Sequence, residues 1–165
     1  MRVYVPATLP MLQQLVVDRL LHARNGTAFA VTPTLREAYA EGDDDELADV
    51  ALREAALASL RLLAGEGISG LPPRRAVLVA DVEGATARPD LDDSVVRLSA
   101  PIGYDDVVAA YVDNADAEPA VLPAIDAVDA ADLGDEDAEF VVGDAQDHDL
   151  AWYAPQELPF LLELL

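Results

Sequence analysis

The segment AVLVADV, residues 76 to 82, constrains the fold most strongly because it is almost continuously apolar. A strand with one solvated face alternates apolar and polar residues, so an unbroken apolar run predicts a strand covered on both faces. A long helix is predicted just before it, at 45 to 64, where Leu47, Leu57 and Leu60 share one helical face. A covered strand next to such a helix predicts a layered fold with a central sheet.

The rest of the chain reads mostly as short strands and helices. We predict further strands at residues 2 to 6, 27 to 32, 94 to 100, 140 to 142 and 150 to 154. We predict further helices from the Thr8 cap to Asn25, from Thr32 or Pro33 to Tyr39, at 105 to 112 and at 156 to 165. Residues 83 to 93 are predicted as an acidic turn region, and the stretch 113 to 139, rich in Ala, Asp and Pro, is consistent with a short helix or a loop.

These elements predict an α+β fold, a single-domain sandwich over residues 1 to 165 with helices packed on a mixed or antiparallel sheet. A strand, a proline and a helix recur in two pairs of segments, RVYVPATLPML with VRLSAPIGYDDV and FAVTPTLREAY with AWYAPQELPFL. One interpretation is an internal duplication with pseudo-symmetric halves at 1 to 82 and 94 to 165, in which 113 to 139 is an acidic insertion. Chance similarity between segments rich in Ala, Val and Pro is the other.

Acidic residues are distributed unevenly along the chain. The net charge is −22: residues 1 to 80 contain ten acids and eight arginines (net −2), and residues 81 to 165 contain twenty-two acids and two arginines (net −20). A half of one sign repels nucleic acid and anionic membranes and attracts cations or basic surfaces. We therefore expect no direct nucleic-acid binding and no membrane binding. Salt adaptation or a GC-rich genome would explain the same acidity without any partner.

Cysteine is absent, which excludes disulfides and thiolate chemistry. The N-terminus contains proline and polar residues where a signal peptide would be apolar, and no apolar run is long enough to span a membrane. We therefore predict a cytoplasmic protein. No catalytic residue is assigned, because no serine stands in a nucleophile motif or beside a base.

The segment GDAQDHD carries the candidate metal ligands Asp144, Asp147, His148 and Asp149. Carboxylate oxygens and an imidazole nitrogen are suitable ligands for a divalent cation, which is the one cofactor that the sequence suggests. The segment lacks the glycine turn and the terminal glutamate of an EF-hand loop. A solvated loop between two strands of a hairpin is the alternative interpretation.

The C-terminal end of the chain is its most apolar part and contains Trp152, Tyr153, Phe160 and Leu161. Core packing is one interpretation of these residues. The other is a contact with a partner or a second subunit, since an apolar patch of this size would be a liability if it stayed uncovered. The sequence leaves the oligomeric state open.

Four segments, MRVYVPATLPML, TAFAVTPTLREAYAEGDDDELADVAL, RAVLVADV and AWYAPQELPFL, together resemble a family of small actinobacterial proteins with a domain of unknown function. The resemblance implies a cytoplasmic bacterial protein of GC-rich origin and brings no catalytic residues with it. Three functions stay open: a non-enzymatic binding or regulatory module for a basic protein partner, a metal-assisted hydrolase using the Asp144 to Asp149 cluster, and a self-associating structural protein. We favour the binding module because the charge is one-sided and no catalytic constellation is present.

Overall fold

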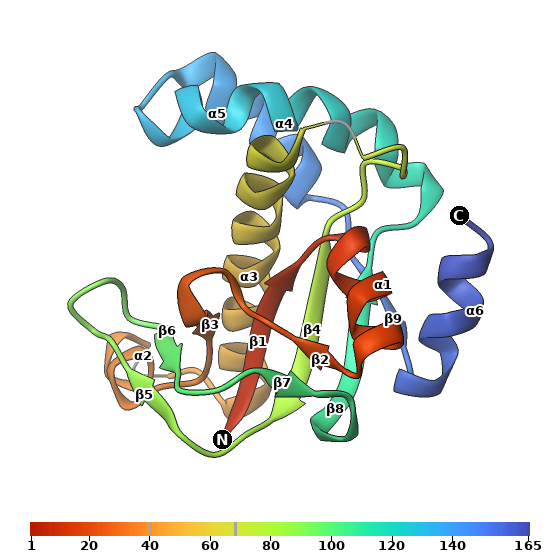
Figure 1. Cartoon of the computed structure of the whole chain (residues 1–165). Helices are drawn as coiled ribbons and strands as arrows, with labels where there is room; N and C mark the ends of the chain where they lie inside the picture. The colour runs from red at the N-terminus through yellow and green to blue at the C-terminus, as the bar shows by residue number, and fades with distance from the viewer. Residues whose placement is uncertain (40, 68) are drawn as a thin grey trace.

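A seven-stranded antiparallel sheet organises the structure, a computed structural model that describes residues 1–39, 41–67 and 69–165 (Figure 1). The strand order is β5-β6-β3-β1-β4-β8-β9. The strand bounds are β1 Arg2–Ala7, β3 Thr27–Phe29, β4 Ala76–Asp81, β5 Ala85–Ala87, β6 Val95–Leu98, β8 Val107–Val112 and β9 Ala151–Tyr153. A separate short ladder pairs β2 (Leu20–Leu21) with β7 (Ile102–Gly103). The α+β class is confirmed, and of the two predicted sheet types the antiparallel one is observed.

Strand β4 occupies the central position that its apolar sequence predicts. It pairs with β1 on one side and with β8 on the other. Its side chains alternate between two layers: Leu78 belongs to a cluster with α1 (Leu9–Asp18) and Val77 to a cluster with α3 (Asp44–Glu66). Burial on both faces is what a continuous apolar strand requires.

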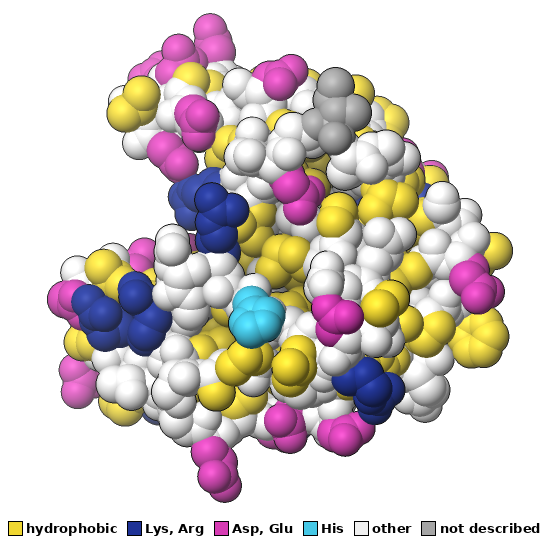
Figure 2. All heavy atoms as spheres, viewed as in Figure 1, with side chains coloured by type: hydrophobic (Ala, Val, Ile, Leu, Met, Phe, Trp, Pro, Cys, Tyr) yellow, Lys and Arg dark blue, Asp and Glu magenta, His cyan; other side chains and the backbone are white. Residues whose placement is uncertain are grey.

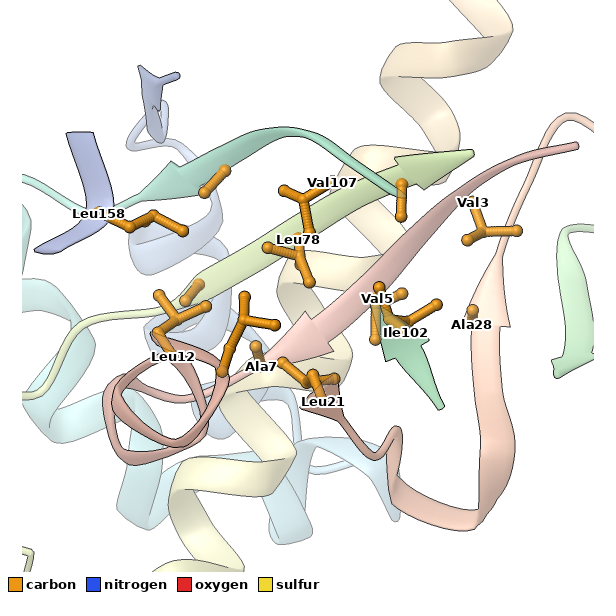
Figure 3. Packing of buried hydrophobic residues seen from close by; sticks show 14 of the residues in the cluster. Val3, Val5, Ala7, Leu12, Leu21, Ala28, Leu78, Ile102, Val107 and Leu158 are labelled. Atoms are coloured by element: carbon orange, nitrogen blue, oxygen red, sulfur yellow. The ribbon is translucent and has the colours of Figure 1, made fainter. Parts of the chain in front are cut away.

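Helices α1 and α6 (Leu158–Glu163) cover one face of the sheet. Leu12 and Leu158 are fully buried in a cluster that also contains Val5 and Leu78 of the central strands (Figure 3). Burying one leucine side chain contributes about 1.5–3 kcal/mol. This layer contains most of the large aliphatic side chains and forms the main core of the domain.

Helix α3 covers the opposite face, where it packs on β1, β4 and β3. Its C-terminal half continues beyond the sheet and packs, through Leu60, against α4 (Glu118–Asp132) and α5 (Glu136–Gln146). These two helices form an antiparallel hairpin at one end of the sheet (Figure 1). The small α2 (Pro33–Ala38) lies near the other end.

The helix starts follow the capping rules on which the sequence prediction rested. Thr8 and Thr32 accept hydrogen bonds from the backbone of the first turns of α1 and α2. Asp43 does the same for α3, with its Oδ1 2.8 Å from the Glu46 nitrogen. A side-chain oxygen at this position satisfies one of the free N–H groups of a helix.

The helix predicted at 105 to 112 is wrong. A single 3₁₀ turn (Tyr104–Asp106) leads into strand β8, which pairs with β4 along its whole length. The segment Val107–Val112 contains β-branched residues, an aromatic and two alanines. Its local preference is weak, and pairing with the buried β4 decides the outcome.

The strand predicted at 140 to 142 is also wrong, because these residues lie inside α5. Val142 and Ala145 are buried against Val121 and Val128 of α4, so tertiary packing overrides the β preference of Phe-Val-Val. The segment after it is therefore a helix end rather than a hairpin tip. Of the two alternatives for 113 to 139, the helical one is observed, and it forms α4 and the start of α5.

Two further differences concern the ends of elements. The first helix ends at Asp18 rather than near Asn25, because Arg19 takes a left-handed conformation (φ 63°) and the chain turns into β2. The predicted turn region at 83 to 93 contains the edge strand β5. Of the segments aligned by the duplication hypothesis, β3–α2 and β9–α6 share a strand, a proline and a short helix, whereas β6 is followed by strands.

Candidate functional site

The predicted metal ligands lie around the C-terminal end of α5. Asp144 is in its last turn, Asp147 is the residue after its end, and His148 and Asp149 begin the connection to β9; all four are exposed. Among the residues that the structure describes, no group of three or more His, Asp or Glu side chains is arranged to hold a metal ion. The metal site stays a prediction, with calorimetric titration of divalent cations as its test.

The same segment contributes to a buried ion-pair network. Arg75 is 1% exposed and Asp113 is 0% exposed, and the two form a bidentate pair with N–O distances of 2.7 and 2.8 Å. Arg75 also donates to the Gln146 side chain and to the His148 carbonyl, both at 2.9 Å. A buried guanidinium needs several acceptors, and this arrangement supplies them. The end of α5 is thereby fastened to the central strands.

Sequence reasoning missed this network because its members lie far apart in the chain. Arg75 immediately precedes β4 and Asp113 immediately follows β8, so pairing of the two strands brings them together. Asp113 N–H donates to the Arg75 carbonyl, and Arg75 N–H donates to the Asp113 carboxylate. A prediction of 107 to 112 as a strand paired with β4 would have placed Asp113 opposite Arg75 at the end of the two strands.

The outer face of α5 is acidic and has an aromatic residue at its centre. Phe140 is 78% exposed, although Val142 and Ala145 of the same helix are buried against α4. It lines a shallow depression of about 470 Å³ together with Gly143 and a set of acids: Glu136, Glu139, Asp144 and Asp147. We call these six residues the α5 surface. Acidic side chains gather over this part of the molecule in Figure 2.

Gly143 contributes to this depression without a packing reason. A Cβ atom built at this position would meet no atom within 4 Å. Glycine inside a helix costs about 0.5–1 kcal/mol relative to alanine. The α5 surface therefore combines an exposed phenylalanine and a helix-interior glycine, two features that folding alone does not favour.

The acids of the α5 surface have no basic neighbours on their own helix, since the chain contains no Lys or Arg after Arg97. Arginines of the first half do reach other acids nearby: Arg61 pairs with Asp132, and Arg74 pairs with Glu118. The hydrogen bond to Asp132 raises the pKa of Arg61 above its usual value. These pairs attach α4 to α3 and to the start of β4. Arg53 donates to the Gln146 carbonyl at 3.4 Å and places one positive charge at the end of α5, where the four acids of the α5 surface outnumber it.

The predicted partner-binding residues divide into two groups. Tyr153 and Leu161 pack on the main core, and their role in partner binding stays a prediction. Trp152 on β9 and Phe160 on α6 are 57% and 69% exposed. Phe140, which sequence reasoning did not single out, is more exposed than either.

The fold and these surfaces define an α+β domain with a strongly acidic helical hairpin and exposed aromatic residues on its C-terminal elements. The chain belongs to a family of unknown function (DUF6912), whose model matches residues 1–162. The comparisons with curated proteins and with solved structures give no match. The resemblance to a family with a domain of unknown function is confirmed; the actinobacterial origin stays a prediction.

None of the helices in the described residues is long and apolar enough to cross a membrane. The cytoplasmic location stays a prediction.

Proposed function

We propose that the protein is a non-enzymatic binding module that docks a basic protein partner on the α5 surface. The observation that carries this proposal is Phe140, a large apolar side chain held 78% exposed within a ring of carboxylates. An aromatic residue inside an acidic surface matches the chemistry of lysine and arginine side chains. Their charge pairs with carboxylates, and their aliphatic stems and cationic heads pack on the ring.

The position of the α5 surface supports the same proposal. The inner side of α5 is buried against α4, and its end is fastened by the Arg75 network, so the outer side is presented by a fixed helix. A rigid surface loses little conformational entropy when a partner binds. The strong negative charge of the second half (net −20) also accelerates encounter with a basic partner.

An affinity pull-down with matched variants tests this function. The full chain is immobilised at physiological salt and exposed to a lysate of its native host, in parallel with Phe140→Ala and with the double variant Glu139→Gln/Asp144→Asn. We expect the wild type to retain a basic protein, and both variants to retain at least about fivefold less, as for loss of a central aromatic or charge contact.

Phe160→Ala is the matched control, because Phe160 is a similarly exposed aromatic on a different element. It should retain the partner as the wild type does. Recovery of the same protein by Phe140→Ala at wild-type levels, or recovery of no basic protein at all, would contradict the proposal.

Self-association is the second candidate, and it is favoured by α6. Phe160 and Leu164 of this region are 69% and 85% exposed. Static light scattering at increasing concentration tests it. A mass that rises for the wild type and stays monomeric for Phe160→Ser would support self-association, and a constant monomer mass would reject it.

A further inference from the structure

Strand β9 forms one edge of the main sheet, next to β8. Its register pairs Tyr111 with Trp152, and Val112 with Ala151. On its other side, β8 pairs with β4, and just beyond the two strands the Asp113 N–H donates to the Arg75 carbonyl. This bond shows which residues of β8 direct their backbone groups to β4 and which to β9. Because N–H and C=O groups alternate sides along a strand, Tyr111 bonds to β4 and Val112 bonds to β9.

The pair of Tyr111 and Trp152 is therefore the non-hydrogen-bonded kind. The N–H and carbonyl of Trp152 point away from β8, toward the open edge of the sheet. Such groups are a template for an added strand, unless the protein covers or blocks the edge. After β9, the Ala154 N–H already donates to the Glu157 side chain. The backbone groups open to an added strand are therefore those at the start of β9 and at Trp152.

The Trp152 side chain lies on the α3 side of the sheet, beside Tyr111. Helix α3 packs on β1, β4 and β3 and leaves this edge open, so the indole is 57% exposed. Tyr4 belongs to the same aromatic group: burial raises the pKa of its hydroxyl, and the nearby Tyr111 adds to the effect. An exposed indole beside a free strand edge supplies both backbone and side-chain contacts for an extended peptide.

Charge decides between the possible occupants of this edge. The residues that flank Trp152 in the chain include the exposed acids Asp149 and Glu157, and the whole chain carries −22. A second copy of the chain would bring the same acids and the same net charge to the edge, and like charges brought together are destabilising. A peptide with arginine or lysine side chains is complementary to it.

We infer that β9 accepts an extended basic segment of a partner protein as an added strand, with an arginine or lysine lying against Trp152. A residue directly across from Trp152 in the added strand projects from the same face as the indole. Its cationic head can lie over the ring, where the attraction is strongest for tryptophan. This site is separate from the α5 surface, so either can fail without the other.

Trp152 is the single tryptophan of the chain, so its fluorescence reports on this site directly. The probe is a short capped peptide that alternates arginine and valine, titrated into the full chain at low salt. We expect a saturable blue shift of the emission, because the added strand removes water from the indole. A peptide with glutamate in place of arginine should give no shift.

Two controls separate strand addition from general charge attraction. The first is the same peptide with N-methyl groups on the amides that would face β9, which should bind about tenfold more weakly because backbone hydrogen bonds are lost. The second is calorimetric titration of Trp152→Thr, which keeps β propensity and should also bind about tenfold more weakly.

Phe140→Ala should bind the arginine–valine peptide as the wild type does. Three results would overturn the inference: no saturable shift with the arginine–valine peptide, equal binding of the methylated peptide, or unchanged affinity in Trp152→Thr. A protein that is already dimeric through β9 before any peptide is added would also overturn it, because the edge would be occupied by a second copy.

Discussion

Helices α3 and α5 both begin with an aspartate cap and a run of acids, but their later turns differ. Asp43 caps α3 with its Oδ1 2.8 Å from the Glu46 nitrogen, and Asp135 caps α5 with its Oδ1 2.9 Å from the Ala138 nitrogen. Acids in a first turn stabilise a helix because they face the positive end of its dipole. To this point both helices obey the same folding rule.

Beyond the first turn the two helices diverge. Helix α3 carries Arg53 and Arg61, and the acid in its last turn, Glu66, accepts a hydrogen bond from the Thr8 hydroxyl at 2.7 Å. Helix α5 carries no basic residue, and Asp144 and Asp147 stand at its C-terminal end, where the dipole disfavours negative charge. The first-turn acids and Glu66 of α3 have folding reasons, whereas the later acids of α5 oppose folding. This difference points to a binding role for α5.

The largest expected effect breaks the attachment of α5 to the sheet. Asp113→Ala leaves the guanidinium of Arg75 buried without its carboxylate, which typically costs about 3–5 kcal/mol. We expect this loss in the free energy of unfolding measured with urea. The double variant Arg75→Met/Asp113→Leu should recover most of it, because no unpaired charge remains. A loss below about 1 kcal/mol in the single variant would mean that the network does not fasten α5.

The second effect compares the two caps. Asp43→Ala and Asp135→Ala should each lower the free energy of unfolding by about 1 kcal/mol, since each removes the acceptor for one helix N–H group. Replacement by Asn, which also caps, should cost much less in both. A negligible effect at one cap alone would show that its helix start is held by tertiary packing rather than by the aspartate.

The third effect concerns one glycine in each helix. A Cβ at Gly65 of α3 or at Gly143 of α5 would meet no atom within 4 Å. Each Gly→Ala change should therefore raise the free energy of unfolding by about 0.4–1 kcal/mol. Only Gly143→Ala adds a methyl group to the α5 surface, so it alone should weaken retention of the basic partner in the pull-down. If Gly65→Ala and Gly143→Ala retain the partner equally, the depression beside Gly143 is not part of the binding site.

The sequence was sufficient where one local rule dominated. The apolar run of β4 predicted its central position, and Thr8 and Thr32 predicted two helix starts. Each of these features depends on a few neighbouring residues and on solvent exclusion alone. They are therefore readable before any tertiary contact is known.

The remaining features depended on contacts between distant parts of the chain. Strand β8 owes its conformation to β4, and the Phe-Val-Val segment of α5 owes its conformation to α4. The exposure of Phe140 could be predicted only after α5 was known to be a helix, because a strand would have placed it on a different face. Two of the candidate metal ligands named from sequence, Asp144 and Asp147, belong to the α5 surface, but its aromatic centre was not among the candidates.

The smallest expected effect tests the one acid of α3 that burial disfavours. Desolvation raises the pKa of Glu54, and the charge of Asp92 adds to the shift. When the pKa of a carboxyl group is higher in the folded state than in the unfolded state, the group does not affect stability at a pH below its unfolded-state pKa. It lowers stability as the pH rises from the unfolded-state pKa through the folded-state pKa. Glu54→Gln should therefore match the wild type near pH 4 and gain stability above it. The gain at pH 7 should stay below about 0.5 kcal/mol, because part of the side chain still reaches solvent.

Urea unfolding of both proteins across this pH range measures that difference. Asp126→Asn on α4 is the control, because Asp126 is an exposed helical acid and forms none of the ion pairs found among the described residues. Its effect should be smaller than that of Glu54→Gln. A Glu54→Gln gain that persists unchanged at pH 4 would assign the effect to packing rather than to the carboxylate charge, and Glu54 would then no longer count as an acid of α3 whose charge opposes folding.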